Sequence, residues 1–305
     1  MKNKVLVSAI IPSRDRKVFL VNAINSVQKQ TYPVHEIIVV DDYSYYDVDT
    51  YLNSVFNRGK GIPIIVKRNQ RRRGAAVSRN IGVKYSKGDF VAFLDSDDCW
   101  LPDKIEKQMD IYYNNEMVEL VYCDHYTLYN GDLINSDKIL HDRNIWKNLL
   151  EGWFAFPNTS SLLINKEIFL YINGFSSDLK SCQDHDLWMK IGMHGINVKY
   201  VKESLYVINI NAINRISLNY WDRVNGVDSF FSKWSEDIVK HGGINNYRSF
   251  RNKYFVAAFF DIFVLSVMNF KFLISFHIFI YRFIKNQIFY RKVVERLKCY
   301  IYSNN

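Results

Sequence analysis

The first hundred residues alternate between short, continuous apolar runs and segments with helical periodicity. The apolar runs are "KVLVSAII" from residue 4, "EIIVVDD" from residue 36, "IPIIVKRN" from residue 62 and "DFVAFLDSDD" from residue 89. A strand that is covered on both faces has a continuous apolar sequence rather than an alternating one. We therefore predict four buried strands in this part of the chain.

The segments between these runs have the spacing of helices. Apolar residues recur at Leu20, Ala23, Ile24 and Val27, a weaker helical pattern covers about 47–57, and "GAAVSRNIGVKYS" at 74–86 carries Val77, Ile81 and Tyr85 along one stripe. Strands that alternate with helices predict an α/β fold with a parallel sheet. In open parallel sheets, ligands bind at the carboxyl ends of the strands.

Polar residues follow the predicted strands at these ends. They are Pro12, Ser13 and Arg14, then Asp41 and Asp42, then Arg68 and Asn69, and finally Asp95, Asp97 and Asp98. Three carboxylates within four positions repel one another and require a cation. Mg²⁺ and Mn²⁺ prefer carboxylate oxygens and bridge readily to diphosphates. The acidic cluster therefore predicts a divalent metal that carries a nucleotide diphosphate.

The middle of the chain has a different pattern. "VELVYCDHYTLY" at 118–129 and "INVKYV" at 196–201 read as strands, "NGD" at 130–132 as a turn, "TSSLLI" at 159–164 as a short strand, and 182–195 as a helix. This pattern predicts a mixed, partly antiparallel region. From about residue 245 the chain is rich in Phe, Ile and Tyr with interspersed basic residues, which predicts two or three amphipathic helices.

Four motifs occur in an order that resembles a known family. They are "VSAIIPSRDR", "QTYPVHEIIVVDDYS", "RRRGAAVSRNIGVKYSKGDFVAFLDSDDCWLPDKI" and "NGFSSDLKSCQDHDLWMKIGMHG". Over about residues 4–220 the chain resembles the family 2 glycosyltransferases, inverting enzymes of the GT-A fold. The resemblance implies a GT-A nucleotide-diphospho-sugar transferase fold with a mostly parallel central sheet, flanking helices and a C-terminal helical extension. The expected domains are a catalytic domain at 1–220, with a nucleotide-binding half at 1–100 and an acceptor-binding half at 101–220, and a helical region at 221–305.

The resemblance also implies roles for individual residues. Pro12, Ser13 and Arg14 would line the base and ribose pocket, Asp42 would bind the nucleobase, Arg73 and Arg79 would lie near the nucleotide, Asp95 would face the ribose, and Arg215 would contact the diphosphate. Asp97, with Asp98 close by, would hold Mn²⁺ or Mg²⁺. Asp184 would be the general base that accepts the proton of the acceptor hydroxyl.

The sequence departs from the family pattern in two places. Gln183 stands where a glutamate normally precedes the base, and the diphosphate position downstream offers Arg215 and no histidine. Asp186 competes with Asp184 for the role of base, and motif position favours Asp184. Asp41 reads as a structural residue of the turn after its strand.

These motifs predict a metal-dependent inverting glycosyltransferase. It would move a sugar from a nucleotide sugar, most often UDP-linked in this family, to a hydroxyl of a glycan or lipid-linked acceptor in bacterial surface polysaccharide synthesis, such as a capsule or lipopolysaccharide. The alternative is a catalytically inactive, membrane-peripheral scaffold. An aspartyl phosphatase is less consistent with the sequence, because Cys99 stands where such enzymes have Thr or Val. A nucleotidyltransferase is less consistent too, because it would have a Gly-rich phosphate loop near the first strand, and "IPSRDR" contains no glycine.

The charge balance adds expectations about partners and location. The chain has 40 Lys and Arg against 31 Asp and Glu, a formal net charge of +9, which favours anionic partners. No aromatic stacking pattern accompanies the arginines at 71–73, so we expect no nucleic acid. Four scattered cysteines fit the reducing cytoplasm. The C-terminal helices would either pack on protein, including a second subunit in a homo-oligomer, or lie on the inner face of the cell membrane.

Overall fold

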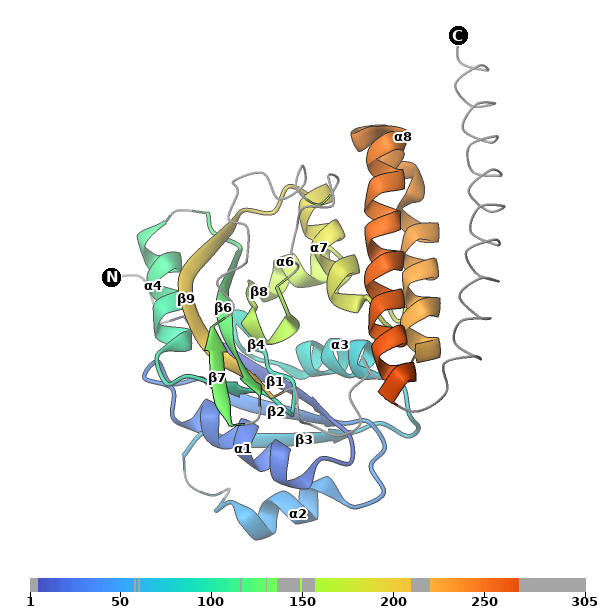
Figure 1. Cartoon of the computed structure of the whole chain (residues 1–305). Coiled ribbons are helices and arrows are strands. Elements are labelled where there is room, and N and C mark those ends of the chain that lie inside the picture. The colour runs from blue at the N-terminus through green and yellow to red at the C-terminus, as the bar shows by residue number, and fades with distance from the viewer. Residues whose placement is uncertain are drawn as a thin grey trace. The chain divides into compact units, whose positions relative to one another are not determined.

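The computed structural model describes residues 5–57, 59, 61–115, 117–129, 131–135, 149, 157–209 and 220–268. The chain divides into two compact units, residues 1–247 and 248–305. Within the described residues, the first unit is built on a nine-stranded sheet in the order β3-β2-β1-β4-β8-β6-β9-β5, with β7 paired to β6 (Figure 1).

The first half of this sheet is parallel, as the apolar runs predict. Its strands are β1 (Val7–Ser13), β2 (Glu36–Asp41), β3 (Ile64–Arg68) and β4 (Phe90–Phe93). Ser13 lies opposite Asp41, which in turn lies opposite Arg68. The carboxyl ends of three strands therefore meet at one edge. The strand β4 is shorter than predicted, because Asp98 N donates to Asp95 O at 2.9 Å and turns the chain there.

The second half of the sheet is mixed, as predicted. Its strands are β5 (Cys99–Trp100), β6 (Leu120–Tyr129), β7 (Asp132–Asn135), β8 (Leu163–Asn165) and β9 (Val198–Asn209). Strand β9 runs parallel to β6, whereas β8 is antiparallel to both β4 and β6. The prediction of one strand over 159–164 is wrong: Thr159–Ser161 form the 3-10 helix η1, because Leu162 N donates to Thr159 O, and β8 begins only at Leu163.

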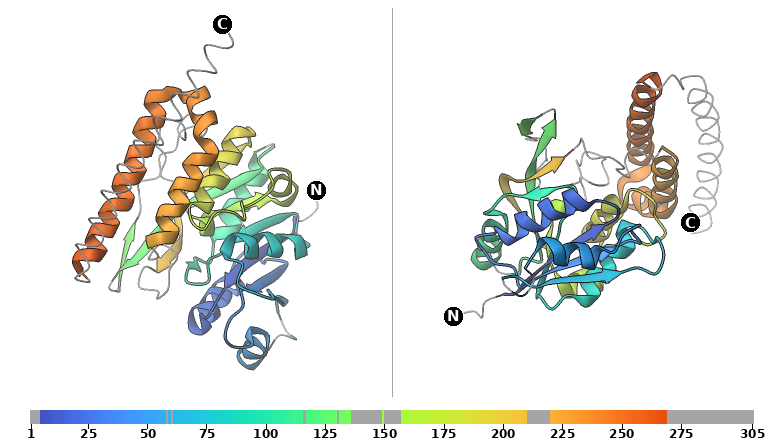
Figure 2. Two further views of the ribbon diagram at one scale, coloured as in Figure 1. Left: turned by 90° about the vertical axis from the view of Figure 1, so that its right-hand side faces the viewer. Right: turned by 90° about the horizontal axis from the view of Figure 1, so that it is seen from below.

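Helices cover both faces of the sheet. The helices α1 (Lys17–Gln28), α2 (Val48–Val55) and α4 (Lys104–Asn114) share one buried core with Val7, Ala9 and Ile11 of β1. Figure 2 shows α1 and α2 together over this face. Helix α3 (Ala75–Tyr85) packs on the opposite face against Ile10, and α6 (Lys166–Tyr171) contributes Phe169 to a ring contact with Phe93 there.

Two more helices follow in the chain, and the second continues beyond the first unit. Helix α7 (Gln183–Met193) follows the cap residue Cys182, and α8 (Tyr220–Met268) is interrupted at Gly243, whose φ of 80° is not helical. The first compact unit runs to residue 247 and so includes the N-terminal part of α8. The division of the chain into functional domains at residue 220 stays a prediction. The predicted helices beyond Met268 lie outside the described residues. In the part of the chain that the structure describes, no helix is both long and apolar enough to cross a membrane.

Candidate active site

The acidic turn after β4 is held by a buried serine from another part of the chain. Ser160 Oγ accepts a hydrogen bond from Asp95 N at 3.0 Å and donates one to Asp98 Oδ2 at 2.7 Å. Asp98 is buried, and one of its carboxylate oxygens is thus engaged inside the protein. Burial and the Asp98 charge raise the pKa of the adjacent Cys99 thiol to about 11, so the thiol is the favoured form at neutral pH.

Two arginines neutralise the other acids of the turn. Arg79, in the first turns of α3, pairs with Asp95, and Arg16, just before α1, pairs with Asp97 at 2.5 Å between its Nη1 and Oδ2. The Asp95 side chain is 34% exposed and that of Asp97 is 12% exposed. The turn therefore offers carboxylates and guanidinium groups together, which suits a ligand with both phosphates and a bound cation.

Asp42 organises the loop that leads into α3. Its Oδ1 accepts hydrogen bonds from Asn69 Nδ2 at 2.9 Å and from Arg73 N at 2.7 Å, and its Oδ2 accepts one from Gly74 N at 2.9 Å. Gly74 has a φ of 88°, a conformation that favours glycine. The main chain at Arg73 is thereby fixed near the strand ends, while the Arg73 side chain is exposed.

The end of β1 lies beside Asp42. Ser13 O accepts a hydrogen bond from Asp42 N at 2.8 Å. Pro12 and Ser13 are buried, and Ser13 Oγ has no hydrogen-bond partner among the described residues. Buried hydroxyls are normally satisfied, so this atom suits a polar group of a ligand. Arg14 is exposed and lies 3.5 Å from the carboxylate of Asp15.

Asp184 lies in the first turn of α7, after Cys182 in the left-handed conformation with a φ of 58°. Its side chain is 29% exposed, and its Oδ1 accepts a hydrogen bond from His185 N at 3.0 Å. Gln183 turns back and donates from Nε2 to Leu179 O at 2.8 Å. A carboxylate that remains in contact with solvent can accept a proton from an incoming hydroxyl.

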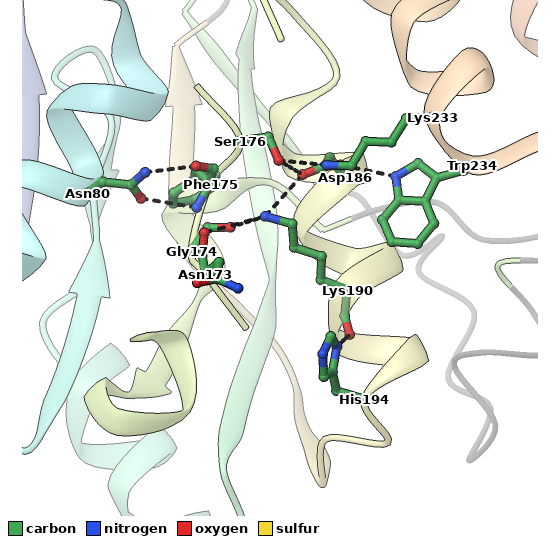
Figure 3. Close-up of polar contacts among 10 residues, drawn as sticks. All are labelled: Asn80, Asn173, Gly174, Phe175, Ser176, Asp186, Lys190, His194, Lys233 and Trp234. Carbon is green, nitrogen blue, oxygen red and sulfur yellow. Dashed lines mark hydrogen bonds and ion pairs between the residues drawn. The ribbon is translucent and has the colours of Figure 1, made fainter. Parts of the chain in front are cut away.

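Asp186, the competing candidate for the base, is fully buried and already engaged (Figure 3). It accepts hydrogen bonds from Ser176 Oγ at 2.6 Å, Lys233 Nζ at 2.5 Å and Trp234 Nε1 at 3.0 Å. Lys190 Nζ lies 3.5 Å from the same carboxylate. Both carboxylate oxygens of Asp186 are therefore engaged inside the protein, whereas the Asp184 side chain reaches solvent.

A chain of contacts joins the acidic turn to α7. The Arg79 guanidinium, which pairs with Asp95, lies 5.2 Å from the centre of the Phe175 ring. The side chain of Asn80 binds both the N and the O of Phe175, at 3.0 and 2.7 Å (Figure 3). Ser176, the next residue, donates to Asp186 on α7. The helix that carries Asp184 is thus tied to the acidic turn after β4.

The carboxylates at the acidic turn fit the implied divalent cation only if phosphate oxygens and water complete its coordination. Among the described residues, no group of three or more His, Cys, Asp and Glu is arranged to hold a metal ion. Mg²⁺ and Mn²⁺ do not need such a cage, because they are commonly held by one or two carboxylates and complete their coordination with phosphate oxygens and water. Asp97, at the turn and balanced by Arg16, is consistent with this mode of binding.

Sequence reasoning missed two residues of this site. Arg16 and Ser160 had no assigned role, although "IPSRDR" contains Arg16 and "TSSLLI" contains Ser160. Arg16 lies within one of the four motifs, so its position could have been noticed. Ser160 contacts Asp95 and Asp98, which precede it by 65 and 62 positions, and contacts over such distances leave no local pattern. Arg215 lies outside the described residues.

Comparison with known proteins identifies the family of this chain. The model of glycosyl transferase family 2 matches residues 8–159. A protein of Escherichia coli named UDP-Glc:alpha-D-GlcNAc-diphosphoundecaprenol beta-1,3-glucosyltransferase WfgD is 31% identical over 190 residues, which cover 61% of this chain and 69% of that protein. The chain belongs to glycosyl transferase family 2. This confirms the resemblance predicted from the four motifs.

Two further matches define how far the similarity extends. An uncharacterized glycosyltransferase of Haemophilus influenzae is 33% identical over 193 residues, which cover 61% of this chain and 62% of that protein. The chain therefore spans less than two thirds of that relative. The crystal structure of Staphylococcus aureus TarS 1–349 in complex with UDP-GlcNAc superposes with a TM-score of 0.59 at 19% identity, over 80% of this chain and 73% of that one. This likeness confirms the predicted GT-A fold.

Proposed function

We propose that this family 2 member transfers one sugar from a UDP-linked donor to a hydroxyl of a glycan or lipid-linked acceptor in bacterial surface polysaccharide synthesis. The observation that carries the proposal is a chain of contacts from Asp95 through Arg79 and Phe175 to Ser176, which binds Asp186. It joins the acidic turn, where the donor would bind, to the helix that carries Asp184. The name of the Escherichia coli relative, which specifies UDP-Glc and a diphosphoundecaprenol acceptor, supports the choice of donor and acceptor class.

In the proposed reaction, Asp184 removes the proton from the acceptor hydroxyl. The hydroxyl oxygen forms a bond to the anomeric carbon, and the bond from that carbon to the diphosphate breaks with its electron pair on the phosphate oxygen. The attack comes from the face opposite the leaving group, so the anomeric centre inverts. A single base suffices, because no covalent intermediate forms.

The chain's own residues hold the donor in this proposal. Ser13 Oγ and the end of β1 line the base and ribose pocket, Asp42 fixes the loop at Arg73 beside it, and Asp95 faces the ribose. Asp97, with Asp98 close by, would hold Mn²⁺ or Mg²⁺, which neutralises charge on the departing diphosphate. Arg16 and Arg79 place two further positive charges at this turn.

The substitution Asp184→Asn tests the proposed base. We expect the kcat for sugar transfer to fall by about 10²–10⁴-fold, because a general base contributes this much, while the donor still binds. Asp178→Asn, at an exposed acid that precedes the same helix, is the matched control and should transfer normally. A product with inverted anomeric configuration in the NMR spectrum supports the single displacement. Unchanged turnover in Asp184→Asn would refute the assignment of the base.

The catalytically inactive scaffold is the alternative function, and the same experiment separates the two. A scaffold would show no transfer even for the wild-type chain with any donor. The engaged but solvent-accessible Asp184, at 29% exposure, weighs against it, because an unused catalytic position need not keep an accessible carboxylate.

A further inference from the structure

The N-terminal part of α8 touches the start of α7 at three successive points. Gly226 packs so closely on Ser181 that a Cβ atom there would collide with its side chain. Four residues later, the Phe230 ring meets the His185 ring edge-to-face, with centroids 6.2 Å apart. One turn further, Lys233 and Trp234 bind the carboxylate of Asp186 (Figure 3).

These contacts come from one face of α8. Residues 226, 230, 233 and 234 follow the i, i+4, i+7, i+8 spacing of a single helical stripe. On α7 they meet residues on both sides of Asp184 in the sequence. Ser181 precedes the helix, and His185 and Asp186 follow Asp184 within its first turn. The first turn of α7 is therefore braced on both sides of the proposed base.

Asp184 and Asp186 face different surroundings on the same helical turn. Residues that are two positions apart in the sequence lie about 200° apart around the axis of an α-helix. The structure agrees, since the Asp186 side chain is fully buried and that of Asp184 is 29% exposed. Anchoring Asp186 therefore fixes the rotation of the helix about its axis, and with it the direction in which Asp184 points.

The anchor is a buried carboxylate between cations and neutral donors. Lys233 Nζ also donates to Ser176 Oγ at 2.7 Å, and Lys190 Nζ donates to Gly174 O at 2.7 Å. The pKa of Lys190 is lowered by burial, an effect that the Asp186 charge opposes. A buried ion pair with all its hydrogen bonds made gives little net stability but enforces one geometry. Removing one partner leaves an uncompensated charge.

We propose that the α8 stripe of Gly226, Phe230, Lys233 and Trp234, acting through Asp186, positions the general base Asp184 for transfer. The stripe lies outside residues 8–159, which match the family model, so it assigns a catalytic consequence to the segment after the matched region. Asp186 and Lys233 are positioning residues and do not touch the reacting atoms. The inference rests on the proposed function, because it concerns the base of that reaction.

The substitution Lys233→Met in the full chain tests this role, with Lys240→Met at an exposed position of the same helix as the matched control. We expect kcat to fall about tenfold or more, while the Kd of UDP with Mn²⁺, measured by calorimetry, changes less than about twofold, because only the base is displaced. Lys233→Arg, which keeps the charge, should recover most of the loss. Amide hydrogen exchange at 183–187 should become about tenfold faster in Lys233→Met, since the local opening costs less free energy.

Each outcome has a defined meaning. A Lys233→Met protein with a lower thermal midpoint but unchanged kcat at 20 °C would make the contact merely structural and overturn the proposal. Gly226→Ala provides a second route, because it disturbs the packing of α8 on α7 at Ser181 without removing a charge, and it should also lower kcat. If the wild-type chain transfers no sugar, the proposed function fails. Amide hydrogen exchange at 183–187 then tests by itself whether the α8 stripe holds the start of α7 in place. An unchanged exchange rate in Lys233→Met overturns that role.

Discussion

At the scale of single residues, the acidic turn depends on one buried hydroxyl. Ser160 bonds both the main chain of Asp95 and the side chain of Asp98. The local sequence "LDSDD" predicted a cluster of acids at a strand end, and the structure has the cluster there. It could not predict Ser160, because hydrogen bonds between distant positions leave no periodic signal in the sequence.

Ser160→Ala should lower the free energy of unfolding by about 2–3 kcal/mol, because it leaves a buried amide and a buried carboxylate oxygen without their partner. Chemical denaturation measures this change. Ser54→Ala is the matched control, since Ser54 Oγ donates to Tyr51 O at an exposed helical site. Equal losses in the two variants would contradict the role assigned to Ser160.

The same scale separates Asp184 from Asp186. Motif position alone favoured Asp184 as the base and left Asp186 as a rival. Burial and hydrogen bonding distinguish the two, because Asp186 is fully buried and bound by Ser176, Lys233 and Trp234. These partners come from 10, 47 and 48 positions away, so no sequence pattern could have identified them.

At the scale of helices and strands, strong periodicity predicted the elements of the parallel half and weak periodicity missed others. The four apolar runs became β1 to β4 in the parallel half of the sheet. Helix α4 had no clear signal, because two of its four buried residues, Lys104 and Gln108, are polar. Strand β5 has two residues and is too short for any pattern.

Close packing of α3 on the sheet makes a prediction at this scale. Gly82→Ala would ordinarily favour a helix, but a Cβ atom there would collide with Ile10 and approach Val40 at 3.4 Å. We expect the free energy of unfolding to fall by about 1–3 kcal/mol, the usual cost of overpacking. Lys84→Ala, at an exposed position of α3, should change it by less than about 0.5 kcal/mol. A Gly82→Ala protein more stable than wild type would contradict this packing.

At the scale of the whole molecule, the basic charge is concentrated in the second compact unit. Residues 248–305 carry ten Lys and Arg against two Asp and Glu, together with many Phe, Ile and Tyr residues. The sequence predicted either packing on protein or contact with a membrane for this region. Which of the two applies depends on the partner that this region meets.

We predict that the full chain sediments with vesicles containing anionic lipid, because basic and aromatic residues interact with headgroups and the acyl boundary. Binding should weaken as salt rises from about 0.1 to about 0.5 M, because the Debye length falls by roughly half over this range. Neutral vesicles of phosphatidylcholine are the control. Equal binding to neutral and anionic vesicles would contradict the role of the basic charge, and no binding to either would favour packing on protein.

The central claim is that the sheet edge with Asp95 and Asp97 binds a nucleotide sugar together with a divalent metal. The most direct test is a thermal-shift series of the purified chain with UDP and a panel of UDP-sugars, each with Mn²⁺ and each with chelator. A ligand that binds only the folded state raises the midpoint by mass action. We predict stabilisation by UDP that requires Mn²⁺, greater stabilisation by one UDP-sugar, and loss of both in Asp97→Ala but not in Asp132→Ala, an exposed acid on β7. No nucleotide-dependent shift in the presence of metal, with Asp97→Ala indistinguishable from wild type, would contradict the account.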